Sequence, residues 1–441
     1  MTSQLRTQIK IIFAMYVGYG AMMICRQMVT ILSPAMLADE ALGLTKTNIG
    51  DFLAYGTLGA LAGKVIWGPI CDTLGGRFTL LIGLVFTALL LAGFGMSGNI
   101  MAFTVCSTLL YMTKSSGWPG MTKLVGNWIH PTKYGRVWGI LSTSSRASVV
   151  LGTLFFGWLL GLMHWRSVAF ISVGVAIAVI VYCYFFLSNQ PTDPKFIEAH
   201  NESNLSNQMK AEQQKALDNL NNHPLKDSSL RQALLDFVKS HRVWLIAIAM
   251  MVLTCMMAFL DFASMYLMEV YNLTPTQAAM NSSVFPLGSL TGLLLSIFFY
   301  DRFSKSGIRN VLAITMLVAL VCVLTLQYLP SFGLEEVVNF NIARICIFLF
   351  GLSISPAYYI PMSVFSIEYG GPHSATLVCI LDAFGFAASA SFGFVGGRLA
   401  DSAGGWFSFM NLLVGIILVA TISVWTFMHA EYKVYNRSRP F

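Results

Sequence analysis

Long apolar segments recur along the whole chain and constrain its fold more than any other feature. A segment of about 20 mostly apolar residues is needed to cross the hydrocarbon core of a membrane. Because backbone polar groups must be satisfied internally in lipid, such segments form α-helices. The sequence therefore predicts an all-α integral membrane protein with twelve transmembrane helices, near 11–36, 47–70, 78–97, 101–128, 135–160, 166–187, 242–268, 278–300, 309–328, 341–367, 375–399 and 405–428.

The composition supports a membrane protein. The 441 residues are 56% hydrophobic and 11% charged, whereas soluble proteins carry about 25% charged residues. Too few charges remain to cover a water-facing surface. The eight cysteines occur singly, with no CxxC or Cys/His cluster, so neither a metal site nor a disulfide framework is expected. We expect no cofactor.

A polar stretch divides the apolar segments into six and six. We predict an N-terminal six-helix bundle at 1–187, a cytoplasmic central loop at 188–240, a C-terminal six-helix bundle at 241–430 and a cytoplasmic tail at 431–441. Residues 205–240 of the loop have some helical character.

The distribution of lysine and arginine predicts the orientation. If both termini are cytoplasmic, eighteen of the 27 basic residues lie in inside segments and four at outside ends. The positive-inside rule favours this multi-pass topology. Most of the net charge of +7 is then an orientation signal, and we expect no nucleic-acid partner.

Five basic residues remain inside the predicted spans. A cation at the centre of a membrane helix costs about 2.5–3.5 kcal/mol on insertion scales and normally faces a bundle interior or a watery cavity. Some of these cations could pair with Asp51, Asp261 or Asp382 as structural ion pairs. For the whole set, the excess of positive charge indicates an anionic ligand. The five are Arg26, Lys64, Lys114, Lys123 and Arg146.

One loop motif resembles a known superfamily. After the second span the chain reads Gly68-Pro-Ile-Cys-Asp72-Thr-Leu-Gly75-Gly76-Arg77, which resembles the GxxxDxxGxR loop of the major facilitator superfamily. Its counterpart after the eighth span keeps Asp301 and Arg302 but has Ile297 in place of the glycine. The resemblance implies twelve helices in two six-helix bundles, with Gly68, Asp72, Gly75, Arg77 and Asp301 acting in conformational gating.

Further motifs resemble the organophosphate:phosphate antiporters of that superfamily, which carry glycerol 3-phosphate, hexose phosphates or glucose 6-phosphate. The first span has Gly18-Tyr19 and Arg26, like the family's GY…R segment. The matching segments, in order, are Gly18–Arg26, Lys64–Asp72, Gly117-Trp118-Pro119 with Lys123 and Trp128, Leu260-Asp261-Phe262, and Pro356 with Glu368.

The chain departs from this family at three places. Met256 occupies the position where the family places a second cation in the seventh span. Ser145 aligns with the histidine of the glycerol-3-phosphate carriers, with Arg146 beside it, and Asp382 is an acid where the family is usually uncharged. The phosphate site is therefore not the family's clamp unchanged.

The resemblance implies a secondary transporter that exchanges an organophosphate, a sugar phosphate or glycerol phosphate, for inorganic phosphate by alternating access. Arg26 is the expected principal anion ligand, assisted by Lys114 and Arg146. Lys64 and Lys123 would attract the anion at the cytoplasmic mouth. The aromatic residues that would shape the pocket are Tyr19, Tyr55, Trp118, Tyr358 and Tyr359. The expected coupling or charge-pair residues are Asp261, Asp382 and Glu368. We expect a monomer in the bacterial cytoplasmic (inner) membrane.

Two alternatives stay open. The chain could be a proton-coupled carrier of a carboxylate, amino acid or sugar that uses Asp382, since burial can raise the pKa of a carboxylate toward the working pH. It could also be a solute sensor that does not transport. A pump or an enzyme is disfavoured, because the sequence has no G-x-x-x-x-G-K-[ST], G-x-S-x-G or H-E-x-x-H motif.

Overall fold

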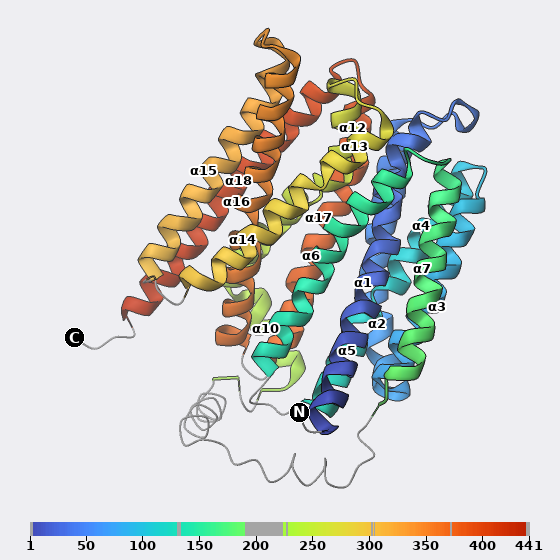
Figure 1. The fold of residues 1–441 in the computed structure, drawn as a ribbon. Coiled ribbons are helices and arrows are strands. Elements are labelled where there is room, and N and C mark those ends of the chain that lie inside the picture. Colours follow the sequence, from blue (N-terminus) through green and yellow to red (C-terminus); the bar gives the residue numbers. More distant parts are fainter. Residues whose placement is uncertain are drawn as a thin grey trace. The chain divides into compact units, whose positions relative to one another are not determined.

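The computed structural model describes residues 3–129, 134–189, 224–225, 228–300, 303, 305–370 and 373–437, and in this part of the chain every regular element is a helix. Figure 1 shows long helices running side by side within each half of the chain. In order, the elements are α1 (Ser3–Leu37), η1 (Glu40–Leu42), α2 (Lys46–Leu74), α3 (Gly76–Met96), α4 (Ile100–Lys114), α5 (Gly117–Trp128), α6 (Tyr134–Leu159), α7 (Trp165–Phe186), α10 (Leu230–Lys239), α11 (His241–Met257), α12 (Leu260–Val270), α13 (Pro275–Ser282), α14 (Val284–Tyr300), α15 (Lys305–Tyr328), η3 (Leu329–Ser331), α16 (Glu336–Gly370), α17 (Ser374–Asp401) and α18 (Gly405–Arg437).

The all-α membrane fold is confirmed. Eleven helical stretches among the described residues are long and apolar enough to cross a membrane. The twelfth expected span, 101–128, is divided between α4 and α5, each too short to be counted alone. The chain is therefore a multi-pass membrane protein.

Three of the expected spans are interrupted by a turn. Pro119 has no N–H to donate to the carbonyl of Ser115, which weakens a continuous helix at this point, and α4 ends at Lys114. In the same way, Pro286 cannot bond the carbonyl of Ser282, where α13 ends. The seventh span breaks between α11 and α12 at Ala258–Phe259, and no proline lies there. Discontinuous helices of this kind recur at the binding sites of transporters.

The helices separate into two compact units. The first contains residues 1–211 and 272–283, and the second contains residues 212–271 and 284–441. Helix α13 thus belongs with the first unit, where it packs on α6 (Figure 1). A division of the sequence at the central loop alone would place α13 in the second unit instead.

The first unit is held together by close packing of α2 on α4. A Cβ at Gly59 or Gly63 would collide with the carbonyl oxygens of Thr108 and Met112. The Trp67 indole N–H donates to the Met112 carbonyl at 3.0 Å. The absence of side chains at the two glycines therefore allows the backbones of the two helices to touch.

A polar network ties the loop ends of the first unit together. The Trp165 indole N–H donates to Asp39 Oδ2 at 2.9 Å. Arg166 Nη1 donates to the carbonyls of Gly95 and Ser97, at 2.6 and 2.8 Å. The hydrogen bond from Trp165 holds the pKa of the Asp39 carboxyl below its usual 3.8, helped by the Ala41 backbone N–H and the nearby charges of His164 and Arg166.

In the second unit, the short helix α10 covers one end of the bundle. Ala233 and Phe237 lie one turn apart on α10 and are buried against Phe365, Leu377 and Phe427. An ion pair lies beside this cluster: Arg242 donates from Nε and Nη2 to the two carboxylate oxygens of Glu431, both at 2.7 Å. The helical character expected within 205–240 is thus found at Leu230–Lys239.

Candidate functional site

The Arg26 side chain stacks on an aromatic ring from another helix. Its guanidinium carbon lies 4.7 Å from the centroid of the Tyr111 ring, within cation–π range. Arg26 comes from α1 and is half-buried, whereas Tyr111 comes from α4 and is buried. Residues Tyr19 and Arg26 are seven apart on α1, so they lie on the same face of that helix.

A second cation makes the reciprocal contact. Lys114 Nζ of α4 lies 5.9 Å from the ring centroid of Tyr19 on α1. The Tyr19 ring in turn meets Trp118 of α5 edge-on, with centroids 5.9 Å apart at 61°. Each of the two helices α1 and α4 thus supplies one cation and one aromatic ring to the other. We call Arg26, Tyr111, Lys114, Tyr19 and Trp118 the α1–α4 cluster.

The cluster depends on close local packing. A Cβ at Gly117 would lie 2.6 Å from Tyr19 Cδ2 and 2.9 Å from Met22 Sδ. A Cβ at Gly56 would lie 3.1 Å from the Tyr111 ring. Because Gly117 and Gly56 have no side chains, the rings of Tyr19 and Tyr111 have room to contact Lys114 and Arg26.

The cluster has the chemistry of an anion site. The guanidinium of Arg26 carries its N–H donors in one plane, a geometry that suits bidentate binding of a phosphate or carboxylate. Tyr111 and Lys114 are three residues, or about 4.5 Å, apart along α4, and Tyr19 and Arg26 are seven residues, or about 10.5 Å, apart along α1. Helices α1–α7 contain only two acidic residues, Asp51 and Asp72, both in α2. The positive charge of this unit therefore exceeds its negative charge by a wide margin.

Lys64 and Lys123 lie elsewhere in the first unit. Lys123 is exposed on α5 beside the start of α3, where a Cβ at Gly76 would lie 3.0 Å from the Cβ of Lys123. Lys64 is half-buried on α2. Gly56, Gly63 and Trp67 share the α2 face toward α4, and Lys64 lies about 80° around the helix from Gly56.

Arg146 is directed away from α1. Ser144 and Ser148 form the α6 face that meets α1: Ser144 Oγ donates to the Tyr16 carbonyl at 2.6 Å, and Ser148 lies against Gly20. Arg146 lies about 160–200° around the helix from these serines. Its Nη1 donates to the Ser142 carbonyl of its own helix at 3.1 Å. Sequence proximity to the Ser145 position thus does not bring Arg146 into the α1–α4 cluster.

Asp261 and Asp382, two acids of the second unit that the sequence predicts for coupling, lie at different levels. Asp261 is buried in the first turn of α12, and Asp382 is half-buried in α17. Phe262, next to Asp261, packs on Phe392 with centroids 5.9 Å apart. Phe392 lies ten residues, or about 15 Å, beyond Asp382 along α17. The two carboxylates therefore do not form a pair. Met256 is fully buried.

The glycine-rich loop after α2 is tied to α7. Gly75 has a φ of +82°, which only glycine adopts without strain. The Arg77 backbone N–H donates to Asn189 Oδ1 at 2.8 Å, and its Nη2 donates to the Tyr184 carbonyl at 2.8 Å. A Cβ at Gly68 would meet no atom within 4 Å. Asp301 lies outside the described residues, as do the side chains of Asp72 and Glu368.

Tyr111 is the member of the cluster that sequence reasoning missed. The expected pocket aromatics included Tyr55, which is 45% exposed, and Tyr358 and Tyr359, which lie in the second unit. One signal was available. Tyr111 precedes Lys114 by three residues, which places both on one face of a helix.

Comparison with known proteins decides the family. Residues 15–381 match the Major Facilitator Superfamily, over more than half of the chain. The chain belongs to the major facilitator superfamily. This is a family of transporters, which confirms the expectation that the chain is not an enzyme.

Three relatives of this major facilitator protein have names that specify a solute. A probable hexose phosphate transport protein of Chlamydia trachomatis is 23% identical over 94% of this chain and 90% of that protein. A protein of the same name in Chlamydia muridarum is 24% identical over 68% of this chain. That match spans 65% of the Chlamydia muridarum protein, just under two thirds of its length. A glucose-6-phosphate exchanger of Homo sapiens is 23% identical over 86% of this chain and 78% of that protein.

A solved structure shares the fold. The crystal structure of a D-xylose-proton symporter superposes with a TM-score of 0.70 at 12% identity, over 95% of this chain and 97% of that one. At this identity, the likeness establishes the major facilitator fold alone. The fold predicted from the sequence is therefore confirmed.

Proposed function

We propose that this major facilitator protein is a secondary transporter of a small organophosphate, a sugar phosphate or glycerol phosphate. The substrate's phosphate group binds at the α1–α4 cluster, with Arg26 as the principal ligand and Lys114 as the second. One observation carries the proposal: two cations inside the first unit stack reciprocally on rings of the facing helix, at 4.7 and 5.9 Å. The names of the relatives, hexose phosphate transport protein and glucose-6-phosphate exchanger, support the same substrate class.

Exchange for inorganic phosphate is the proposed transport mode. Two cations inside a membrane helix bundle are unfavourable when no anion is bound to them. Reorientation by alternating access then proceeds mainly with an anion bound, so the outward and inward fluxes are coupled. The same proposal includes a location in the bacterial cytoplasmic (inner) membrane, with both termini in the cytoplasm. It also includes a monomeric state and a division into bundles at 1–187 and 241–430.

The remaining site residues have secondary roles in this account. Lys64 and Lys123 contribute to the positive potential that attracts the anion. Arg146 contributes in the same way, since its guanidinium bonds its own helix. Gly75 and Arg77 position the turn between α2 and α3, and Gly68, Asp72 and Asp301 are assigned to gating with them. Asp261, Asp382 and Glu368 are assigned to charge pairing or coupling.

The test is uptake of labelled phosphate into proteoliposomes that contain the purified protein and are preloaded with phosphate. Exchange that glucose 6-phosphate or glycerol 3-phosphate inhibits supports the proposal and distinguishes the two substrates. The matched control is liposomes loaded with sulfate, which exposes nonspecific anion leakage. Binding of phosphate without any flux, from protein shown to be folded, would instead indicate the sensor.

A further inference from the structure

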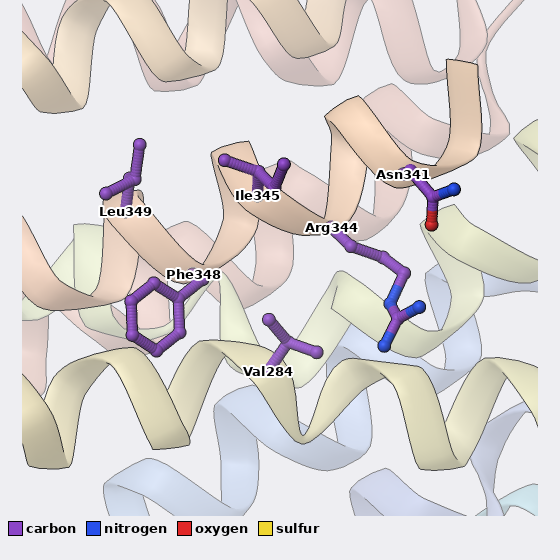
Figure 2. A pocket seen from close by; sticks show the side chains of 6 residues that line it. All are labelled: Val284, Asn341, Arg344, Ile345, Phe348 and Leu349. Carbon is purple, nitrogen blue, oxygen red and sulfur yellow. The ribbon is translucent and has the colours of Figure 1, made fainter. Parts of the chain in front are cut away.

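A cationic pocket lies in the second unit, whereas the α1–α4 cluster belongs to the first unit. It has a volume of about 350 Å³ and is lined by Val284, Asn341, Arg344, Ile345, Phe348 and Leu349. Figure 2 shows five of these side chains coming from one stretch of α16, with Val284 at the start of α14 facing them.

Helix packing explains why the pocket opens at this point. Farther along α14, a Cβ at Gly288 would collide with the Phe348 carbonyl, and one at Gly292 with the Leu352 carbonyl. The two backbones therefore touch at these glycines. One turn before Gly288, α14 carries Val284 instead, and its branched side chain forms a wall of the pocket.

The polarity of the lining changes along α16. The lining residues that come from α16 have the spacing of one helix face; they are residues 341, 344, 345, 348 and 349. Asn341 and Arg344 lie toward the start of the helix, and Ile345, Phe348 and Leu349 extend one turn deeper into the apolar span (Figure 2). The pocket is thus polar at its outer end and apolar at its inner end.

Arg344 brings an uncompensated charge to the outer end. Its guanidinium carbon lies 5.8 Å from the ring centroid of Phe340, one turn earlier on the same helix. Among the described residues, no carboxylate lies within 4.0 Å of its side-chain nitrogens. Arg344 is exposed, and Asn341 beside it adds an amide that can donate hydrogen bonds.

We propose that this pocket binds an anionic phospholipid. The lipid phosphate accepts hydrogen bonds from Arg344 and Asn341, and the start of one acyl chain lies along Ile345, Phe348 and Leu349. Guanidinium groups near a membrane surface attract anionic lipid, and the fork of Arg suits phosphate. A free phosphate ion would satisfy Arg344 but would leave the apolar half of the pocket unused. The inference does not depend on the proposed transport function.

The experiment compares lipid binding by the full-length protein in detergent, using native mass spectrometry with phosphatidylglycerol and phosphatidylcholine. Arg344→Gln removes the charge. Arg398→Gln is the matched control, because Arg398 is also exposed and also lies 5.8 Å from the ring four residues earlier, that of Phe394, yet does not line the pocket. Val284→Phe fills the pocket from the α14 side and keeps the charge of Arg344.

We expect wild-type protein to bind phosphatidylglycerol more tightly than phosphatidylcholine. Arg344→Gln should weaken phosphatidylglycerol binding about fivefold, the effect of about one interfacial cation, and Val284→Phe should weaken both lipids. Arg398→Gln should match the wild type. Equal affinity of the wild type and Arg344→Gln overturns the proposal. Displacement of phosphatidylglycerol by inorganic phosphate, in the wild type but not in Arg344→Gln, also overturns it, because the pocket would then be a site for a soluble anion.

Discussion

The guanidinium of Arg26 lies on the ring of Tyr111, with 4.7 Å between the guanidinium carbon and the ring centroid. The cation–π contact attracts the guanidinium to the ring and limits the positions that its N–H donors can take. Such a contact contributes about 0.5–2 kcal/mol, the larger figure applying where water is excluded. In this account, Tyr111 is a positioning residue for the anion ligand Arg26.

Replacement of Tyr111 should therefore act through Arg26. Tyr111→Leu removes the ring, and we expect the KM for phosphate exchange to rise about 2- to 30-fold, in line with the energy of the contact. Tyr111→Phe keeps the ring and serves as the matched control. Exchange kinetics in proteoliposomes measure both. An equal rise in KM for the two variants would assign the effect to the hydroxyl and contradict the positioning role.

A methyl group at Gly117 should disturb the other half of the cluster. In Gly117→Ala the added carbon meets Tyr19 and Met22 at less than 3.0 Å, and overpacking of this kind costs about 1–3 kcal/mol. We expect a lower Tm in detergent and weaker phosphate exchange, because Tyr19 must move away from Lys114. Gly174→Ala in α7 is the control, since a Cβ at Gly174 meets nothing within 4 Å. Equal Tm values and equal exchange rates for Gly117→Ala and Gly174→Ala would show that Tyr19 has room to move without losing its contact.

Asp382 distinguishes phosphate exchange from proton coupling. If the protein exchanges phosphate at the α1–α4 cluster, Asp382→Asn should keep exchange within about twofold of the wild type, since Asp382 belongs to the other unit. The measurement is exchange with and without an imposed pH gradient. A gradient that drives uptake in the wild type but not in Asp382→Asn would favour the proton-coupled carrier.

Asp39 predicts a pH dependence of stability. Its folded pKa is lower than its unfolded value of about 3.9. Its contribution is therefore present above the unfolded pKa and is lost as the pH falls through the folded pKa. Trp165→Phe removes the hydrogen bond that is the largest cause of the shift. We expect a lower Tm at neutral pH and a difference from the wild type that shrinks below about pH 4. A Tm difference that is constant with pH would assign the loss to packing alone.

The sequence predicted the membrane fold well because hydropathy and chain length determine spans almost independently of tertiary contacts. It predicted the interruption of those spans less well. Pro119 and Pro286 mark two of the breaks. A proline can also be accommodated within a membrane helix, so its presence alone does not predict that the helix is interrupted. The break at Ala258 depends on tertiary packing, which no local motif encodes.

The candidate site was predicted in part. Arg26, Lys114, Tyr19 and Trp118 were expected, and all four are in the α1–α4 cluster. Tyr111 was missed because an aromatic residue in a membrane helix is most often a packing residue. The sequence also predicts Arg146 as a ligand that assists Arg26. Its Nη1 donates to the Ser142 carbonyl of its own helix, and its role in anion binding stays a prediction.

The most direct test of the central claim is phosphate exchange by Arg26→Ala in proteoliposomes, beside wild-type protein and Arg166→Ala. Arg166 is a control with the same change in charge, and it bonds the carbonyls of a loop instead of lying in the cluster. Loss of the principal cation from an anion site costs about 2 kcal/mol or more, or at least about 30-fold in affinity. We predict that Arg26→Ala remains folded and loses exchange, while Arg166→Ala retains it. Near-normal exchange by folded Arg26→Ala would contradict the assignment of the phosphate site to the α1–α4 cluster.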